Sequence, residues 1–238
     1  MAITLTSCIS VDYDLPFLPH FINHYSKLEI DTYLLIFHSK NKFNFSEIHK
    51  TLKPIGHKTL STSWIGDFDA ATKIKKLNEL QSSGYILTTD IDEFQIYDKP
   101  LSDYILEKEI IWGKLRDRET ADSNLATITN ENLNLQFPVV SGKSNWGRGL
   151  FKPCLYPAKY KLLSPHHLTS SEPDEDDVIK IDHFRWVKGR LEKSIERLKN
   201  YNKLNDKGVT WYKYYNRFPT IDLQNVIDEY GVNIKTKI

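Results

Sequence analysis

The segment YILTTDIDEF, residues 85–94, decides the fold, because an apolar run ends abruptly in three carboxylates. Its first four residues have the composition of a buried strand, and Asp90, Asp92 and Glu93 then concentrate negative charge at the carboxyl end. A strand that only packs would stay apolar or alternate with polar residues. The cluster therefore indicates a cation, a base or a structural partner.

Predicted strands and helices alternate along the chain before this segment. Strand composition is found at 2–9, 32–39 and 57–64, and helical spacing at 18–28, 45–53 and 67–84. Ser46 is suited to cap the second helix, and Ala71, Ile74, Leu77 and Leu80 lie on one face of the third. Such alternation predicts an α/β fold with a mostly parallel sheet, which binds ligands beyond the carboxyl ends of its strands.

The second half is predicted to continue the same fold, with a less regular alternation of strands and helices. A helix is expected at 101–109, strands at 110–118, 150–163 and 178–186, and a polar loop suited to a substrate at 120–150. An amphipathic helix at 190–204 and a last helix near 220–230 follow. We expect one domain of 238 residues, made of a first half at 1–98, a second half at 99–190 and a helical extension at 191–238.

Composition excludes several classes of function. Thirty-two basic residues balance 31 acidic ones, so no overall field attracts nucleic acid or a membrane surface. The two cysteines, Cys8 and Cys154, lack metal-ligand spacing and fit a reducing compartment. No signal peptide and no membrane-spanning segment is recognisable. These features predict a cytoplasmic protein, either free or peripheral at the cytoplasmic membrane face.

Two carboxylates directed at one point repel each other unless a cation or a proton lies between them. If the strand continued, Asp90 and Asp92 would share a face, whereas a turn would separate them. Hard carboxylate oxygens suit Mg²⁺ or Mn²⁺, which would in turn neutralise a diphosphate. A plain acidic surface turn is the alternative, and it is weaker here because the motif follows an apolar strand in an α/β frame.

TDIDEF resembles the DxD element of GT-A-fold glycosyltransferases, and its DIDEF form is similar to glycosyltransferase family 92, the former domain of unknown function 23, and to related family 2-like bacterial and viral enzymes. The resemblance extends over most of residues 4–198, through KLRDRETAD, LQFP, FKPCLYPAKYKLLSPHH and IDHFRWVKGRLEKSIERL. The chain departs from the family pattern at Val11 and Asp12, where Asn-Glu is usual, and at Ser164 and Pro165, where glycines often precede the histidine.

The resemblance implies a GT-A, Rossmann-like fold and transfer of a sugar from a nucleotide diphosphate sugar to a glycan acceptor hydroxyl, with inversion. It also implies that residues 1–98 form the nucleotide-sugar-binding half and residues 99–190 the acceptor half. Bound Mn²⁺ or Mg²⁺ would stabilise the leaving diphosphate. Asp92 is the first choice as direct metal ligand, with Asp90 reaching the ribose or the metal through water. His183 is the favoured histidine ligand and His167 the other candidate, whereas His167 and His166 could instead touch the donor or the acceptor.

A general base for such a transfer is expected in RDRETAD. Asp117, Glu119 and Asp122 are the candidates, with Asp117 preferred to Asp122. Strand alternation would direct Asp117 and Glu119 to one face and the two neighbouring arginines to the other. The alternative is a run of solvated salt bridges at a strand edge.

Contacts with the sugar donor are expected in two parts of the chain. Ser10, Asp12 and Asp14 follow the first strand and would border the nucleotide. Lys152, with Lys143 and Arg148, would meet phosphates beside a glycine-containing loop, unless that loop is a plain exposed hairpin. Trp146 could stack on a sugar, and Trp186 is expected to pack in the core.

Two rival functions remain to be compared. A phosphatase that forms an aspartyl-phosphate would carry DxD on its first strand, followed by a small residue and Thr, which this chain lacks. A non-catalytic nucleotide-sugar or glycan-binding protein with the same fold is the second alternative, and the complete DxD pattern argues against it.

Overall fold

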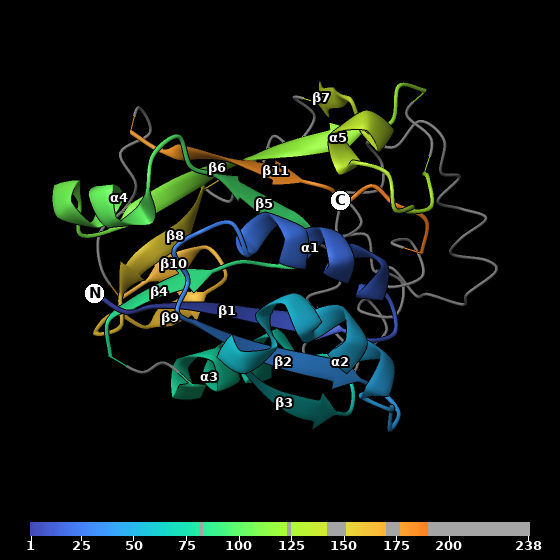
Figure 1. Cartoon of the computed structure of the whole chain (residues 1–238), viewed down its shortest axis with the longest axis horizontal. Helices are drawn as coiled ribbons and strands as arrows, with labels where there is room; N and C mark the ends of the chain where they lie inside the picture. The colour runs from blue at the N-terminus through green and yellow to red at the C-terminus, as the bar shows by residue number, and fades with distance from the viewer. Residues whose placement is uncertain (81–82, 123–124, 142–150, 170–176, 190–238) are drawn as a thin grey trace, which may run out of the picture.

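The computed structural model describes residues 1–80, 83–122, 125–141, 151–169 and 177–189. One sheet crosses the molecule in the order β3-β2-β1-β4-β8-β6-β11-β5, with β7 paired to β6 (Figure 1). The pairs β1–β2, β1–β4, β2–β3 and β6–β11 are parallel, and β8 and β5 run against their neighbours. The predicted α/β, Rossmann-like fold with a mostly parallel sheet and flanking helices is therefore confirmed.

The first half supplies the parallel part of this sheet. Its elements in chain order are β1 (Ile3–Ser10), η1 (Leu15–Phe17), α1 (Leu18–Tyr25), β2 (Thr32–Ser39), α2 (Ser46–Leu52), η2 (Lys53–Lys58), β3 (Thr59–Ile65), α3 (Ala70–Leu80) and β4 (Tyr85–Thr88). Every residue of β1 is buried, as a central strand covered on both faces requires. The strands expected at 2–9, 32–39 and 57–64 are confirmed to within two residues.

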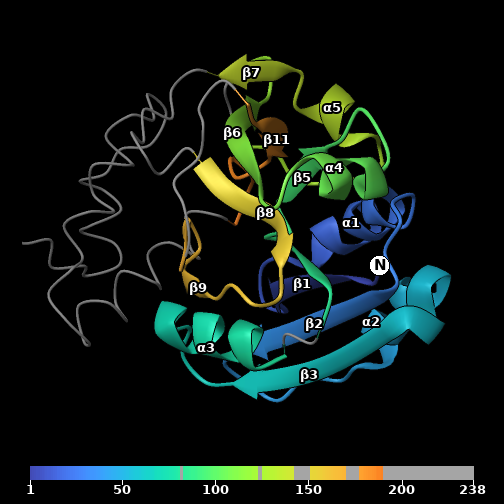
Figure 2. The ribbon, with the colours of Figure 1, turned by 90° about the vertical axis from the view of Figure 1, so that its left-hand side faces the viewer.

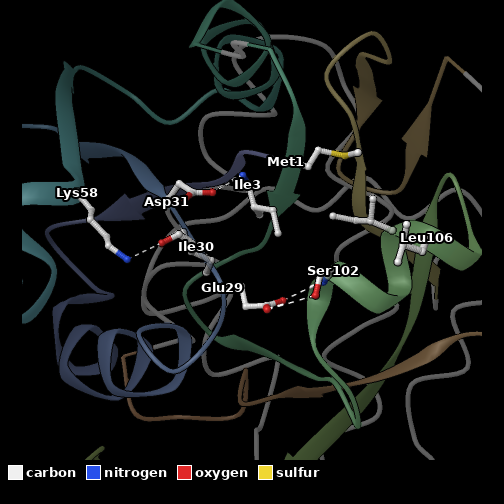
Figure 3. Close-up of a pocket in the computed structure, with 9 residues that line it drawn as sticks. Met1, Ile3, Glu29, Ile30, Asp31, Lys58, Ser102 and Leu106 are labelled. Atoms are coloured by element: carbon white, nitrogen blue, oxygen red, sulfur yellow. Dashed lines mark hydrogen bonds between the residues drawn. The ribbon is translucent and has the colours of Figure 1, made fainter.

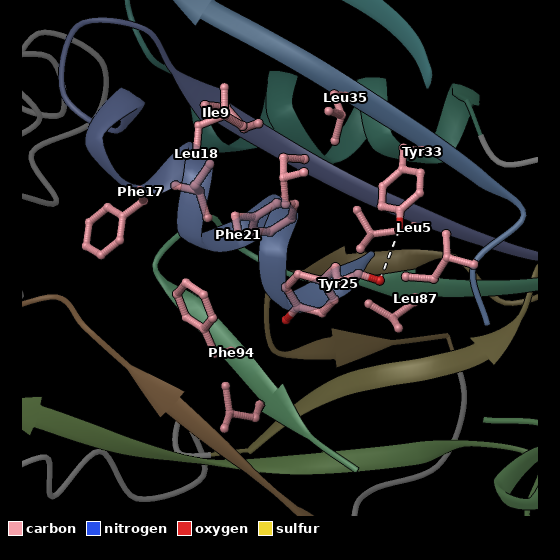
Figure 4. Packing of buried hydrophobic residues seen from close by; sticks show 14 of the residues in the cluster. Leu5, Ile9, Phe17, Leu18, Phe21, Tyr25, Tyr33, Leu35, Leu87 and Phe94 are labelled. Atoms are coloured by element: carbon pink, nitrogen blue, oxygen red, sulfur yellow. Dashed lines mark hydrogen bonds between the residues drawn. The ribbon is translucent and has the colours of Figure 1, made fainter. Parts of the chain in front are cut away.

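Helices cover both faces of the parallel strands, as the two views of the ribbon show (Figures 1 and 2). On one face, Phe21 and Tyr25 of α1 pack against Leu5, Ile9 and Leu35 of the sheet (Figure 4). On the other face, Ile74 and Leu77 of α3 pack with Cys8, Ile36 and Ile86 in a second cluster. Removal of this apolar surface from water is the main driving force that holds the helices on the sheet.

The helix expected at 67–84 is shorter, and its buried face differs from the prediction. Asp69 accepts hydrogen bonds from the Ala71 and Thr72 backbone N–H groups, so the described helix begins at Ala70. Ala71 is exposed, and Lys73 is buried in its place. The face that contains Ile74 and Leu77 therefore carries a cation.

The predicted cap of the second helix is also corrected. Ser46 is the first residue of α2 and not its cap, and the helix has no side-chain cap hydrogen bond. The Ser46 backbone N–H donates instead to Asn44 Oδ1 at 2.9 Å.

The second half folds back onto the sheet and supplies its antiparallel part. Its elements are β5 (Glu93–Ile96), α4 (Leu101–Glu107), β6 (Ile111–Glu119), α5 (Leu133–Gln136), β7 (Val139–Ser141), β8 (Phe151–Pro157), β9 (Leu162–Ser164), β10 (His167–Leu168) and β11 (Ile179–His183). The strands β9 and β10 form a separate two-stranded sheet. The predicted C-terminal helices at 190–204 and 220–230, and Lys143, Trp146 and Arg148, lie outside the described residues.

The segment that contains DIDEF forms two strands, β4 and β5. It breaks at a turn over Ile91 and Asp92, and the chain continues as β5 at the far edge of the sheet, antiparallel to β11. Asp90 and Asp92 consequently belong to a turn and do not share a strand face.

No helix in the described part of the chain has both the length and the apolar character needed to cross a membrane.

Candidate active site

Polar groups from β1, β6, β8 and β11 surround the turn after β4. The turn Thr89–Asp92 follows β4, and its Thr89 N–H donates to Thr6 O of β1 at 3.2 Å. At its other end, Asp92 O accepts from the N–H of Phe184, directly after β11, at 2.8 Å. The middle of the sheet thus presents the DIDEF segment beside the ends of β6, β8 and β11, where a doubly wound sheet places its ligands.

Asp90 lies against two lysines from distant elements. Lys73 of α3 forms an ion pair with Asp90 Oδ1, and Lys152 of β8 lies 3.1 Å from Oδ2. Burial alone would raise the pKa of Asp90, but Lys152 and Lys73 outweigh it and hold that pKa far below its usual range. Asp90 is therefore ionised, and its side chain remains 31% exposed.

Glu93 has a structural partner. Both of its carboxylate oxygens lie 2.7 Å from Lys152 Nζ, and Oε2 also accepts from the Asp90 backbone N–H at 3.1 Å. The Lys152 and Glu93 side chains are 5% and 4% exposed. Burial opposes the charge on Lys152, but Asp90 and Glu93 more than compensate and raise its pKa. Lys152 therefore neutralises the acidic turn, in addition to any contact with a phosphate.

His183 is held between two carboxylates. Its Nδ1–H donates to Asp117 Oδ1 at 2.8 Å, and its Nε2 faces Asp92 Oδ2 at 3.6 Å, beyond hydrogen-bond length. Asp117 Oδ2 accepts from Trp186 Nε1 at 3.2 Å. Burial lowers the pKa of His183, but Asp117 and Asp92 outweigh it and raise that pKa to about 9. Burial also opposes ionisation of Asp117, yet His183 keeps its pKa below the usual range.

The alternation predicted along RDRE is confirmed. Asp117 and Glu119 are 1% and 3% exposed, whereas the side chains of Arg116 and Arg118 reach the opposite face. The parallel register of β6 and β11 places His183 beside Asp117 on one face and Asp182 beside Arg116 on the other. Arg116 Nη2 lies 2.5 Å from Asp182 Oδ1. Strand pleating thus separates the histidine–carboxylate pair from a structural ion pair.

The first loop is organised by its own acidic residues. Asp14 is buried and accepts from the Ser10 backbone N–H at 3.1 Å. Asp12 is exposed and accepts from Ser39 Oγ at 2.9 Å and from the Lys40 N–H at 3.2 Å. All three candidate donor residues are therefore at the carboxyl end of β1, where Asp12 also joins this loop to the end of β2.

Of the two adjacent histidines, His166 lies nearer the acidic turn. Its Nδ1–H donates to Phe151 O at 3.0 Å, and burial together with Lys152 lowers its pKa to about 4. His167 is exposed and hydrogen-bonds Ser164 Oγ at 2.7 Å. The sequence offered both histidines, and the contact of either one with a ligand stays a prediction.

Asp122 and Lys73 differ in how the sequence treated them. Asp122, a candidate base, is exposed in the turn after β6. The sequence did not point to Lys73, although its position next to Ile74 and four residues before Leu77 places it on the buried side of α3.

The turn after β4 offers donor groups for a divalent cation. Within the described ranges, no group of three or more His, Cys, Asp and Glu side chains is arranged to hold a metal ion. Asp92 and His183 nevertheless face each other, and Asp117 fixes the histidine through its other nitrogen, an arrangement typical of metal-binding histidines. Mg²⁺ commonly takes one or two carboxylates and completes its shell with substrate phosphates. The donor set therefore fits a cation shared with a diphosphate.

A cavity of about 470 Å³ lies at the other end of the parallel strands, near the start of β1 (Figure 3). Glu29, Asp31, Lys58 and Ser102 contribute its polar lining. These groups already bond within the fold: Asp31 accepts from the Ile3 N–H and Glu29 from the Ser102 N–H. The cavity is thus remote from the acidic turn and is not part of the candidate active site.

Comparison with known proteins gives likeness in structure alone. No protein-family model and no curated protein matches the sequence. Similar solved structures include S. aureus TarS 1-349 in complex with UDP-GlcNAc, at 8% identity and TM-score 0.47 over 96% of this chain and 76% of that one. Mannosyltransferase PcManGT from Pyrobaculum calidifontis, in complex with GDP-Man and Mn²⁺, has 8% identity and TM-score 0.45 over 83% and 61%. HddC from Yersinia pseudotuberculosis has 9% identity and TM-score 0.41 over 80% and 96%.

These likenesses concern the fold. The narrower resemblance to glycosyltransferase family 92 stays a prediction.

Proposed function

We propose that the chain is a glycosyltransferase that moves a sugar from a nucleotide diphosphate sugar to a glycan acceptor hydroxyl, with Mn²⁺ or Mg²⁺ bound by Asp92 and His183. The observation that carries this proposal is the ordered trio Asp92, His183 and Asp117 at the carboxyl ends of the strands. The bound cation would supply Lewis-acid stabilisation of the diphosphate leaving group.

Asp117 then positions the metal ligand. Both of its oxygens are engaged, one by His183 and one by Trp186, and the side chain is almost fully buried. Such a carboxylate is badly placed to take a proton from an acceptor hydroxyl, which requires direct hydrogen-bond reach. Glu119 and Asp122 remain the candidates for the general base of an inverting transfer.

Asp90 and the lysines prepare the donor side of the site. Asp90 keeps an exposed edge while Lys73 and Lys152 hold its charge, so it can accept a hydrogen bond from a ribose hydroxyl. The two ammonium groups on its oxygens disfavour Asp90 as a direct metal ligand. Ser10, Asp12 and Asp14 would border the nucleotide at the neighbouring strand end, and His166 or His167 would approach from β9 and β10.

The proposal is tested by incubating the protein with a panel of nucleotide diphosphate sugars and Mn²⁺ and measuring release of nucleoside diphosphate. Asp92→Asn should reduce release by at least a hundredfold, whereas Asp103→Asn, on the exposed surface of α4, should leave it unchanged. Release that is unaffected by Asp92→Asn would refute the assigned role.

The alternative is a non-catalytic nucleotide-sugar or glycan-binding protein with the same fold. Calorimetric titration separates the two functions: a binder would take up a nucleotide sugar without releasing nucleoside diphosphate, whatever acceptor is added. Titration of Mn²⁺ into the protein with and without nucleoside diphosphate adds a direct measure of the proposed shared metal shell, because affinity should rise when the diphosphate is present.

A further inference from the structure

The strand β3 forms an open edge of the main sheet. β2 pairs with it over seven registered positions, from Tyr33–Thr59 to Ser39–Ile65, and no strand of the described chain lies on its other side. Its residues 60–63 are exposed, and the apolar side chains of Leu60 and of the terminal Ile65 are 62% and 47% accessible. A row of backbone N–H and C=O groups is thus available to another strand.

This edge lacks the features that usually prevent pairing. Exposed edge strands are commonly protected by charged residues, proline, bulges or short length. The sequence of β3, TLSTSWI, contains no charge and no proline, and its register with β2 is continuous. The opposite edge of the sheet is β5, which has only four residues and begins with Glu93. The difference identifies β3 as the edge suited to association.

The hydrogen-bond pattern defines which residues of β3 face outward. The Gly66 N–H, directly after β3, donates to Ser39 O of β2 at 3.0 Å. Backbone groups of alternate residues point to alternate sides of a strand. The N–H and C=O groups of Ser61 and Ser63 therefore point away from β2, whereas those of Thr62 point towards it.

From this geometry we propose that two copies of the chain associate through β3, edge to edge and antiparallel, and extend the sheet across a twofold axis at Thr62. In this register Ser61 of each copy pairs with Ser63 of the other through outward backbone groups. Leu60 of each copy then lies opposite Trp64 of the other copy. The exposed leucine therefore gains an apolar cross-strand neighbour, and the twofold axis repeats this contact once on each side.

The ends of the strand favour the antiparallel arrangement. Lys58, whose ammonium group donates to Ile30 O at 2.9 Å, directly precedes β3, and the exposed Asp67 follows it. Antiparallel pairing brings the basic end of one strand near the acidic end of the other, whereas parallel pairing would juxtapose like charges. The proposal does not depend on the proposed transferase activity, because the acidic turn lies beyond β4 and not on this edge.

A disulfide trap tests the proposal on the full chain. Facing residues of a non-hydrogen-bonded antiparallel pair have Cα atoms about 4.5 Å apart, within disulfide reach. Thr62→Cys should therefore form a disulfide-linked dimer under mild oxidation, and both native cysteines are buried and should not compete. Leu163→Cys, at another exposed strand position, in β9, is the control and should stay monomeric under the same conditions.

Sedimentation analysis of the unmodified chain supplies the second measurement. We expect a concentration-dependent dimer whose dissociation constant rises by about tenfold or more in Thr62→Lys, because two ammonium groups then face each other at the axis. Leu163→Lys should leave the constant unchanged. A monomer at all concentrations, or a dimer that neither Thr62→Lys weakens nor Thr62→Cys cross-links, would overturn the proposal.

Discussion

Replacement of Lys152 by Met should destabilise the protein strongly, because Lys152 is the only residue that contacts both Asp90 and Glu93 through its ammonium group among the described side chains. Methionine preserves most of the side-chain volume and removes the charge. Asp90 would keep Lys73 as a partner, but Glu93 would lose the ammonium group that lies 2.7 Å from both of its oxygens.

The magnitude follows from the burial of this pair. The Lys152 and Glu93 side chains are 5% and 4% exposed, so water cannot replace the lost partner. Removing one member of a buried ion pair typically costs about 3–5 kcal/mol. In a chain of this length that corresponds to a fall in melting temperature of roughly 10 °C.

Urea unfolding followed by tryptophan fluorescence measures this free energy. Lys50→Met is the control, because Lys50 and Glu47 form an exposed pair and its loss should cost less than about 0.5 kcal/mol. The double variant Lys152→Met with Glu93→Gln should recover part of the loss, since no uncompensated charge then remains buried. A Lys152→Met cost below about 1 kcal/mol, or strict additivity in the double variant, would refute the reasoning.

Three further outcomes are expected. With a chelator present, the free energy of unfolding measured in urea should fall by up to about 3 kcal/mol as the pH rises from 6.5 through about 9. The reason is that the folded state raises the pKa of His183, so the protonated form of His183 stabilises the fold. His183→Gln should remove this dependence on pH. Burial raises the pKa of Cys154, so it should react with Ellman's reagent only after unfolding; reaction in the native state would contradict this. Gly113→Ala should cost about 1–3 kcal/mol in thermal unfolding, since a Cβ would lie 2.6 Å from Ile181 Cδ1, whereas Gly56→Ala meets nothing within 4 Å.

Much of the architecture was predictable because its signals are local. The apolar and β-branched composition of β1 and β2 and the alternation of strands and helices predict a parallel sheet whose strands lie within one or two residues of the observed bounds. The pleat of β6 likewise predicts that Asp117 and Glu119 share a buried face. Period and composition suffice for such features, since they depend only on neighbouring residues.

The candidate site was predictable only in part. The sequence pointed to Asp92 and His183, and the structure brings them face to face. It also offered Asp117 as a base, but the long-range pairing of β6 with β11 engages that carboxylate with His183 and Trp186. The helical spacing of Lys73 indicates burial, but the sequence does not reveal that its ion-pair partner is Asp90.

The sequence by itself determined that DIDEF ends an apolar strand in an α/β frame. Only the tertiary structure decided that the chain turns there, that Asp90 faces Lys73 and Lys152, and that Asp92 faces His183. The physical reason is that hydrophobic periodicity is a property of adjacent residues, whereas ion pairs between residues 17 and 62 positions apart depend on which strand ends the sheet brings together.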